Sequence, residues 1–205
     1  MRPGLAAAAA AGAAALALTG CGADEPLPTT PTLLKVTLPG ESPVPDVATA
    51  FAISPSRAIT VAHAVGDRRT VLVAAPGERE RRVRVLRTDR RLDLALLDVP
   101  GLRAPVFGTG HLDRGAYGSV LVLRGDQRPL LHAQFLRRIT ANVRNAPGAA
   151  ARVRPALELR AEVEQGDSGA PVLDLNGRVL GMVFAQASNR NDRAYALDAS
   201  AFAPR

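Results

Sequence analysis

The stretch Gln165-Gly166-Asp167-Ser168-Gly169-Ala170-Pro171 places a serine between two glycines, after an acid and shortly before a proline. Glycine adopts backbone angles that are strained for other residues, so the chain can bend sharply here. A serine on such a turn is exposed to a substrate carbonyl, and the N–H groups of Gly166 and Ser168 can converge on its oxygen. The same residues also form ordinary turns. The nucleophile hypothesis therefore requires a histidine and a buried acid elsewhere in the chain.

The rest of the chain from residue 47 onward has a β pattern. Short apolar runs, many of them β-branched or alternating with polar residues, are separated by clusters of Gly, Pro, Asp and Asn. No segment before the C-terminus has a sustained helical period, and we expect only a short helix around 199–203. The fold is predicted to be all-β, a sandwich or barrels. The expected strands are 49–54, 57–61, 70–75, 81–87, 93–98, 117–123, 129–138, 153–162, 171–174, 178–185 and 193–197.

Two residues are candidates for the partners of the serine. His63 closes the apolar run 58–62 and is followed by a turn signal, although a lone histidine in such a place is usually structural. Asp93 begins another apolar run, where a buried carboxylate needs a hydrogen-bonded partner. Two acids compete with it: Asp89 lies among arginines, and Asp98 lies at a strand end.

The N-terminus has the form of a signal peptide. A short positive start precedes the apolar run 5–18, which is too short for a comfortable membrane span. The run ends in Leu18-Thr19-Gly20-Cys21, which resembles the lipobox of bacterial lipoproteins, where the cysteine is lipidated and the peptide before it, here residues 1–20, is removed. The alternative is an ordinary secretory signal with a chance cysteine. We expect a lipid on Cys21 to anchor the chain to the cell membrane, facing the periplasm or the cell exterior.

A proline-rich stretch, 21–46, separates this segment from the predicted domain at 47–205 and is expected to be an extended spacer. Within the spacer, 33–38 is a candidate for an early strand that lies on the domain. Cys21 is the only cysteine, which excludes an intrachain disulfide and any zinc site needing two cysteines. His111 and His132 have no neighbouring ligands at metal spacing, so we expect no metal and no cofactor.

The formal net charge of +7 comes almost entirely from arginine, and the densest basic run is 79–91. This run either faces anionic lipid headgroups or is a solvated strand face. Aromatic residues make up only 3% of the chain, and no nucleic-acid motif accompanies the basic residues. We therefore expect no nucleic-acid partner.

Three stretches resemble the signature blocks of chymotrypsin-fold serine proteases, in the order of that family. They are Thr60-Val61-Ala62-His63, Asp93-Leu94-Ala95-Leu96-Leu97 and Gly166-Asp167-Ser168-Gly169-Ala170-Pro171-Val172. Asp93 follows His63 by 30 residues and Ser168 follows Asp93 by 75, spacings similar to those of compact bacterial HtrA-type proteases. The stretch 160–184 also resembles the membrane-anchored periplasmic trypsin-like serine proteases of actinobacteria. The resemblance covers about residues 47–200.

This resemblance implies two six-stranded antiparallel β-barrels, at about 47–110 and 115–200, with the active site between them. It implies a serine endopeptidase in which Ser168 attacks a peptide carbonyl and forms an acyl-enzyme. His63 would move the protons, and Asp93 would orient its ring. The N–H groups of the serine and of the glycine two residues before it would form the oxyanion hole.

The resemblance also assigns a substrate surface. Phe184, Ala185 and Gln186 match the strand that pairs with an extended substrate, and Gln165 is assigned to the same surface. Glu162 falls where the floor of the specificity pocket lies in the family, and a glutamate there would favour a basic P1 residue. The alternative is that Glu162 lies on a solvated loop.

Three positions bear on how the site is supported. Thr60 matches a position that supports the acid of the triad. Phe184 replaces the usual serine, so Asp93 is expected to lose one hydrogen bond. Asp167 matches the acid that pairs with a freed N-terminus in digestive relatives, and a lipidated Cys21 cannot supply that amine. We therefore expect no such activation step and a different partner for Asp167, for example an arginine.

Two other functions remain open. A catalytically inactive lipoprotein would bind extended peptides in the same cleft. An esterase-like hydrolase is opposed by the serine coming last and by the absence of a βαβ pattern. The chain ends 37 residues after Ser168, too few for a PDZ domain, so we expect a monomer without HtrA-style cages. The expected partners are protein or peptide substrates and the membrane.

Overall fold

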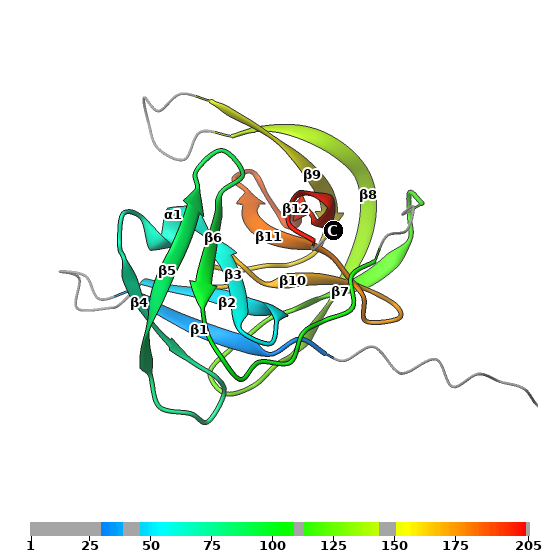
Figure 1. Ribbon diagram of the computed structural model, residues 1–205. Coiled ribbons are helices and arrows are strands. Elements are labelled where there is room, and N and C mark those ends of the chain that lie inside the picture. Colours follow the sequence, from blue (N-terminus) through cyan, green and yellow to red (C-terminus); the bar gives the residue numbers. More distant parts are fainter. Residues whose placement is uncertain (1–29, 39–45, 109–112, 144–150, 204–205) are drawn as a thin grey trace, which may run out of the picture.

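The computed structural model describes residues 30–38, 46–108, 113–143 and 151–203. These residues form two closed six-stranded barrels that lie side by side (Figure 1). The strand order is β1-β2-β3-β6-β5-β4 in the first barrel and β10-β11-β12-β9-β8-β7 in the second. The strands of the first barrel are β1 (Leu33–Leu38), β2 (Asp46–Ser54), β3 (Arg57–Val61), β4 (Thr70–Ala74), β5 (Arg81–Asp89) and β6 (Leu94–Asp98). Those of the second are β7 (Tyr117–Leu121), β8 (Leu130–Val143), β9 (Arg152–Arg160), β10 (Pro171–Asp174), β11 (Val179–Ala187) and β12 (Arg190–Asp198).

The all-β prediction and the two antiparallel barrels are confirmed. Each of the eleven predicted strands corresponds to one of β2 to β12, with ends that differ by a few residues. The largest difference is in β8, which continues to Val143, and β2 and β12 each begin three residues before the predicted start. These strands could be predicted because closing a barrel buries one face of each strand, and that requirement imposes the apolar alternation.

The predicted start of the folded domain at residue 47 is wrong. β1 lies inside the predicted spacer and confirms the early strand expected at 33–38, but it pairs with both β2 and β4 and closes the first barrel. Leu33, Leu34 and Val36 of this strand are each at most 1% exposed. The flanking prolines gave the stretch its spacer-like composition. Its own six residues nevertheless bury enough apolar surface to belong to the core.

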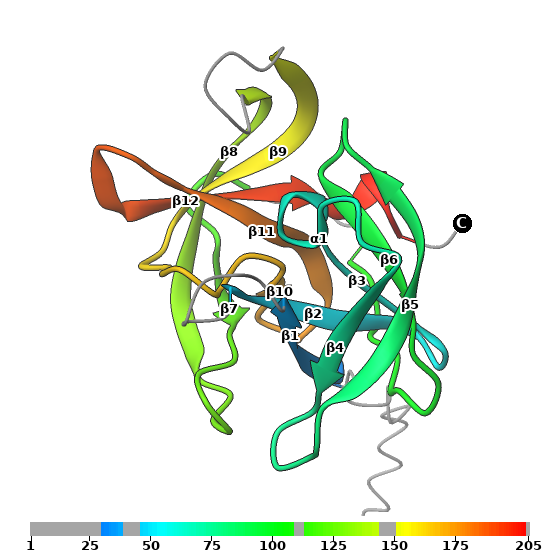
Figure 2. The same cartoon turned by 90° about the vertical axis from the view of Figure 1, so that its left-hand side faces the viewer.

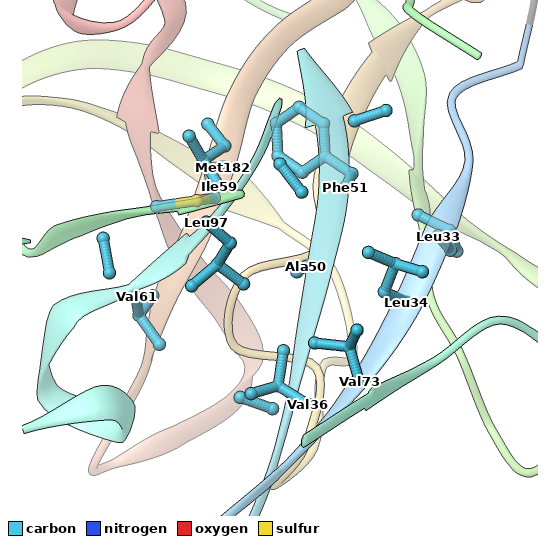
Figure 3. Close-up of a cluster of buried hydrophobic side chains, with 14 of the residues drawn as sticks. Leu33, Leu34, Val36, Ala50, Phe51, Ile59, Val61, Val73, Leu97 and Met182 are labelled. Atoms are coloured by element: carbon cyan, nitrogen blue, oxygen red, sulfur yellow. The ribbon is translucent and has the colours of Figure 1, made fainter. Parts of the chain in front are cut away.

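The two barrels share part of their core. One buried cluster combines residues of the first barrel with residues of the second, and Figure 3 shows Met182 of β11 close to Ile59 and Leu97. A second cluster, which includes Val120 and Leu157, fills the second barrel. Because apolar contacts continue across the boundary, residues on the facing ends of the barrels are held in a fixed relation.

In the described part of the chain, helical structure is limited to two short pieces. α1 (Ala62–Val65) is a single turn directly after β3, and it is too short to leave a periodic pattern in the sequence. η1 (Ala199–Ala201) follows β12 and confirms the predicted short C-terminal helix, here a 3₁₀ turn. Within the described ranges, no helix has the length and apolar character needed to cross a membrane.

Candidate active site

His63 and Asp93 make a two-point contact at one end of the first barrel. His63 lies in α1 after β3, and Asp93 immediately precedes β6, the neighbour of β3. Nδ1 of His63 is 2.7 Å from Oδ2 of Asp93, and the backbone N–H of His63 donates to Oδ1 at 2.8 Å. The His63 side chain is 38% exposed, whereas that of Asp93 is 2% exposed. The hydrogen bond at Nδ1 thus fixes the orientation of the ring, while part of the ring remains exposed to solvent.

The backbone of Asp93 is strained. Its φ of +61° is the only positive value at a non-glycine residue in the described part of the chain. Asp tolerates this conformation better than most residues, and such strain persists where the surroundings fix it. The carbonyl of Asp93 accepts the N–H of Ala62 at 3.0 Å, which joins the same two chain segments a third time.

The carboxyl group of Asp93 is held in its ionised form. Burial raises its pKa, but the hydrogen bonds and charge of His63, together with the nearby charge of Arg154, outweigh burial and leave the pKa lowered. A carboxylate in this position can accept from Nδ1 and leave the other ring nitrogen as a base.

Ser168 lies on the turn between β9 and β10 and contacts the first barrel through Thr49 of β2. The Thr49 N–H donates to the Ser168 carbonyl at 2.8 Å, and the Thr49 hydroxyl donates to the Gly166 carbonyl at 3.0 Å. The Thr60 hydroxyl donates to the carbonyl of Thr49 at 2.7 Å. The prediction that Thr60 supports the acid is therefore wrong, because Thr60 instead supports the strand that holds the serine turn.

Gly169 is required by this close approach. Its φ is +93°, and a Cβ atom at this position would lie 1.8 Å from the Thr49 carbonyl oxygen. Gly166 also has a positive φ, of +98°. Among the described residues, the N–H groups of Gly166 and Ser168 donate to no protein acceptor. Both donors are thus available to an external oxygen.

Asp167 pairs with an arginine, as expected. Its side chain is 3% exposed and lies 3.1 Å from Nη2 of Arg124, in the connection between β7 and β8. The same carboxylate oxygen accepts the N–H of Glu164 at 2.9 Å. The sequence indicated an arginine for this role, but Arg124 is 43 residues away and carries no local signal.

The serine and the histidine are brought to the same region without a direct bond. No hydrogen bond joins the Ser168 hydroxyl to the His63 ring among the described residues. The serine turn bonds to β2, and α1 packs against β2. Contacts between nucleophile and base are often long in free enzymes and shorten when substrate binds.

The predicted substrate strand lines an open pocket of about 480 Å³. Phe184, Ala185 and Gln186 line it together with β8 residues 139–143. Glu162 is exposed and lines a different pocket, with His132 and Arg160. Gln165 is exposed on the serine turn and lines neither of these two pockets. The structure therefore groups the three strand residues and separates Glu162 from them.

One residue at the site was missed by the sequence reasoning. Arg154 of β9 is 0% exposed, and its Nη1 lies 3.1 Å from Oδ2 of Asp93. Arginine is rarely fully buried, and its alternation with apolar residues in β9 is also typical of a solvated strand face. The sequence contained no signal that could have distinguished the two.

No group of three or more His, Cys, Asp or Glu residues suited to a metal ion occurs in the described ranges. The ring of His132 packs against Tyr117, with centroids 5.1 Å apart. Cys21 and His111 lie outside the described residues.

The fold is the chymotrypsin-like double barrel, with a histidine–aspartate pair on one barrel and a glycine-bracketed serine on the other. The model of the trypsin-like peptidase domain matches residues 48–182, and the chain belongs to this family.

Relatives with known names agree with this assignment. The chain is 36% identical over 157 residues to serine protease Rv3671c of Mycobacterium tuberculosis, an alignment that covers 74% of this chain and 39% of the relative. It thus spans about two fifths of that protein. The solved active form of the Rv3671c protease has a TM-score of 0.73 and 32% identity, over 84% of this chain and 78% of that one. The HtrA-type protease AlgW shares the fold, with a TM-score of 0.68 at 18% identity.

Proposed function

We propose that this chain is a serine endopeptidase that cleaves peptide bonds through His63, Asp93 and Ser168. The observation that carries the proposal is the pair of hydrogen bonds between His63 and a buried, ionised Asp93. Such a pair leaves the second ring nitrogen as a base, and a buried carboxylate favours the imidazolium that forms when the base takes a proton.

In the proposed reaction, Oγ of Ser168 attacks the peptide carbonyl as its proton passes to His63. The resulting oxyanion accepts the N–H groups of Gly166 and Ser168, each worth roughly 10²–10³ in rate in comparable sites. His63 then gives the proton to the leaving amine, and an acyl-enzyme remains. Water, deprotonated by the same ring, releases the acid and restores the serine.

An extended segment of the substrate would pair with the strand at Phe184, Ala185 and Gln186, as in strand addition. Support comes from the pocket that these residues line. Glu162 lies outside that pocket and lines another, so we propose no basic P1 preference on its account.

Labelling with a fluorophosphonate tests the activity. We expect the wild type to be labelled, and the variants Ser168→Ala and His63→Ala to remain unlabelled while melting as the wild type does. If a folded wild type is not labelled at neutral or mildly acidic pH, the chain is the inactive peptide-binding lipoprotein instead. The observation that favours this alternative is that no hydrogen bond joins the Ser168 hydroxyl to His63 among the described residues.

We further propose that a lipid on Cys21 holds the domain on the outer side of a cell membrane, as a monomer. The lipobox-like sequence supports the lipid, and two acyl chains suffice for stable anchoring. Relatives named as probable periplasmic endoproteases, 26% identical, support the compartment. Cys21→Ser should move the protein to the soluble fraction and abolish incorporation of a labelled fatty acid. Incorporation that persists in this variant would refute the anchor.

A further inference from the structure

Arg154 contacts the carboxylate oxygen of Asp93 that also faces the histidine ring. Its Nη1 is 3.1 Å from Oδ2 of Asp93, the atom that lies 2.7 Å from Nδ1 of His63, and it also donates to the carbonyl of Leu92 at 3.4 Å. Arg154 is 0% exposed, so the contact is shielded from solvent and salt. Its strand belongs to the second barrel, whereas Asp93 belongs to the first. The hairpin of β8 and β9 extends toward the connection between β5 and β6 in both views (Figures 1 and 2).

Phe184 forms one side of the position that Arg154 occupies. The guanidinium carbon lies 5.0 Å from the centre of the Phe184 ring, a favourable distance for a cation over an aromatic face. Phe184 is 4% exposed and stacks on Tyr195 at 6.5 Å. Phe184 stands where the resemblance expects a serine that donates to the acid. Arg154 supplies a donor in its place, and this donor carries a full charge.

We propose that Arg154 is a positioning residue that holds the Asp93 carboxylate against His63, and that its charge extends the activity of the site to lower pH. This inference rests on the proposed protease function. Arginine stays protonated throughout the working range of the site, so its charge is permanent. A cation beside Oδ2 shares the negative charge of the carboxylate and repels a protonated imidazole. We therefore expect labelling of Ser168 to continue at lower pH when Arg154 is present than when it is replaced by an uncharged residue.

Most of the other charges around the His63–Asp93 pair have partners of their own, and the rest are exposed to solvent. α1 packs against β2, β3 and β6, and β11, which carries Phe184, has no charged residue. The side chain of Asp46 at the start of β2 lies outside the described part. The remaining charges include the pair Arg57–Asp98 at the far ends of β3 and β6, the pair Asp67–Arg90 on the adjoining turns, and Asp89, which accepts the N–H groups of Arg91 and Leu92. On the same turns, Arg68 donates to the carbonyl of Val65 at 3.3 Å, and the side chains of Arg69 and Arg91 are exposed.

The experiment compares the rate of fluorophosphonate labelling across pH in the full chain for the wild type, Arg154→Lys and Arg154→Met. Arg154→Lys keeps the charge and should keep the acid limb of the profile. Arg154→Met should move that limb to higher pH, so that labelling on the acidic side is about tenfold slower than in the wild type. The control is Arg138→Met. Arg138 also pairs with an acid, Asp198 at 2.9 Å, and also lies over a ring, Phe135 at 5.9 Å, but away from the triad.

A second variant separates position from charge. Arg154→Met/Phe184→Ser offers Asp93 a neutral donor in place of the cation. It should label faster than Arg154→Met at alkaline pH and keep the shifted acid limb. If Arg154→Met alone does not fold, this double variant is compared with the wild type in its place.

The proposal is overturned if Arg154→Met keeps the wild-type acid limb, or if Arg154→Lys shifts it as far as Arg154→Met does. A wild type that is never labelled would refute the proposed function instead. In that case the positioning role of Arg154 can still be tested by NMR, through the low-field proton resonance of the His63–Asp93 hydrogen bond. It should be present in the wild type and in Arg154→Lys and be lost or displaced in Arg154→Met, and an unchanged resonance in Arg154→Met overturns the positioning role.

Discussion

Replacing Arg124 with methionine should disable the oxyanion turn and leave the His63–Asp93 pair intact. Arg124 lies 3.1 Å from the carboxylate of Asp167, whose side chain is 3% exposed, and 3.4 Å from that of Glu164. Asp167 stands between the two residues whose N–H groups face the proposed oxyanion. A movement of its side chain therefore turns both of these donors.

The size of the effect follows from the burial of the pair. Removing one partner of a fully buried ion pair destabilises a protein by about 3–5 kcal/mol, because the other charge is left without compensation. The Arg124 side chain is 37% exposed, so water can partly replace it, and about 3 kcal/mol is the appropriate estimate. Asp167 can avoid this penalty by turning outward into water. The competent turn would then be populated about 100-fold less, since each 1.4 kcal/mol is roughly a factor of ten.

The assay is the second-order rate of fluorophosphonate labelling, measured beside the free energy of unfolding in urea. Arg124→Met should label roughly 100-fold more slowly than the wild type. Arg124→Met/Asp167→Asn should recover most of the loss, because a neutral amide oxygen still accepts the N–H of Glu164 and no charge remains buried. Arg128→Met, an exposed arginine of the same connection, is the matched control and should label normally. Labelling of Arg124→Met within twofold of the wild type, in a folded protein, would show that the pair does not hold the turn.

Three further changes have defined outcomes. Gly169→Ala places a methyl group against the Thr49 carbonyl at a positive φ and should lower the free energy of unfolding by about 2–5 kcal/mol and abolish labelling; normal labelling would contradict the close approach. Burial raises the pKa of Asp198, but hydrogen bonds from a backbone N–H and from Arg138 outweigh it and leave the pKa lowered. The stabilisation is therefore present above the unfolded pKa of about 3.9 and is lost as the pH falls through the lower folded value. Asp198→Asn should be about 1 kcal/mol less stable than the wild type at neutral pH and equal to it in acid, and a constant difference across pH would refute this. Phe51→Ala removes a fully buried ring from the shared core and should lower the free energy of unfolding by about 3–5 kcal/mol, whereas a loss under 1 kcal/mol would mean that the cavity collapses.

The strands could be predicted because their signal is local. In β6, for example, alternate residues are buried, so the pattern of the strand depends on its own sequence. The candidates for the proposed triad, His63, Asp93 and Ser168, could also be picked out locally, because each one lies next to a distinctive stretch. β1 was placed in a spacer since its neighbours are prolines, and only its pairing with β2 and β4 makes it part of the barrel.

The supporting residues could not be predicted, because their contacts join distant parts of the chain. Arg154 is 61 residues from Asp93 in sequence, and most arginines of this chain lie on exposed strand faces or turns. Thr60 stands three residues before His63, yet its hydroxyl donates to Thr49. These contact partners are determined by the closure of the barrels, which brings distant segments together whatever the sequence next to each side chain.

Both buried acids of the site are paired with arginines of the second barrel, and this arrangement suits a chain with a single cysteine. No disulfide within the chain can fix the turns around the pocket. Buried ion pairs add little net stability, because desolvation offsets their attraction, but breaking one by removing a single partner is strongly unfavourable. The contribution of Arg154 and Arg124 is therefore to fix the positions of the groups they pair with, more than to stabilise the fold. Arg154 makes displacement of the Asp93 carboxylate from His63 unfavourable, and Arg124 does the same for the turn that carries Ser168. One pair supports the proposed base and the other supports the proposed oxyanion donors, so disruption of the first should change the pH dependence of labelling and disruption of the second should change its rate at every pH.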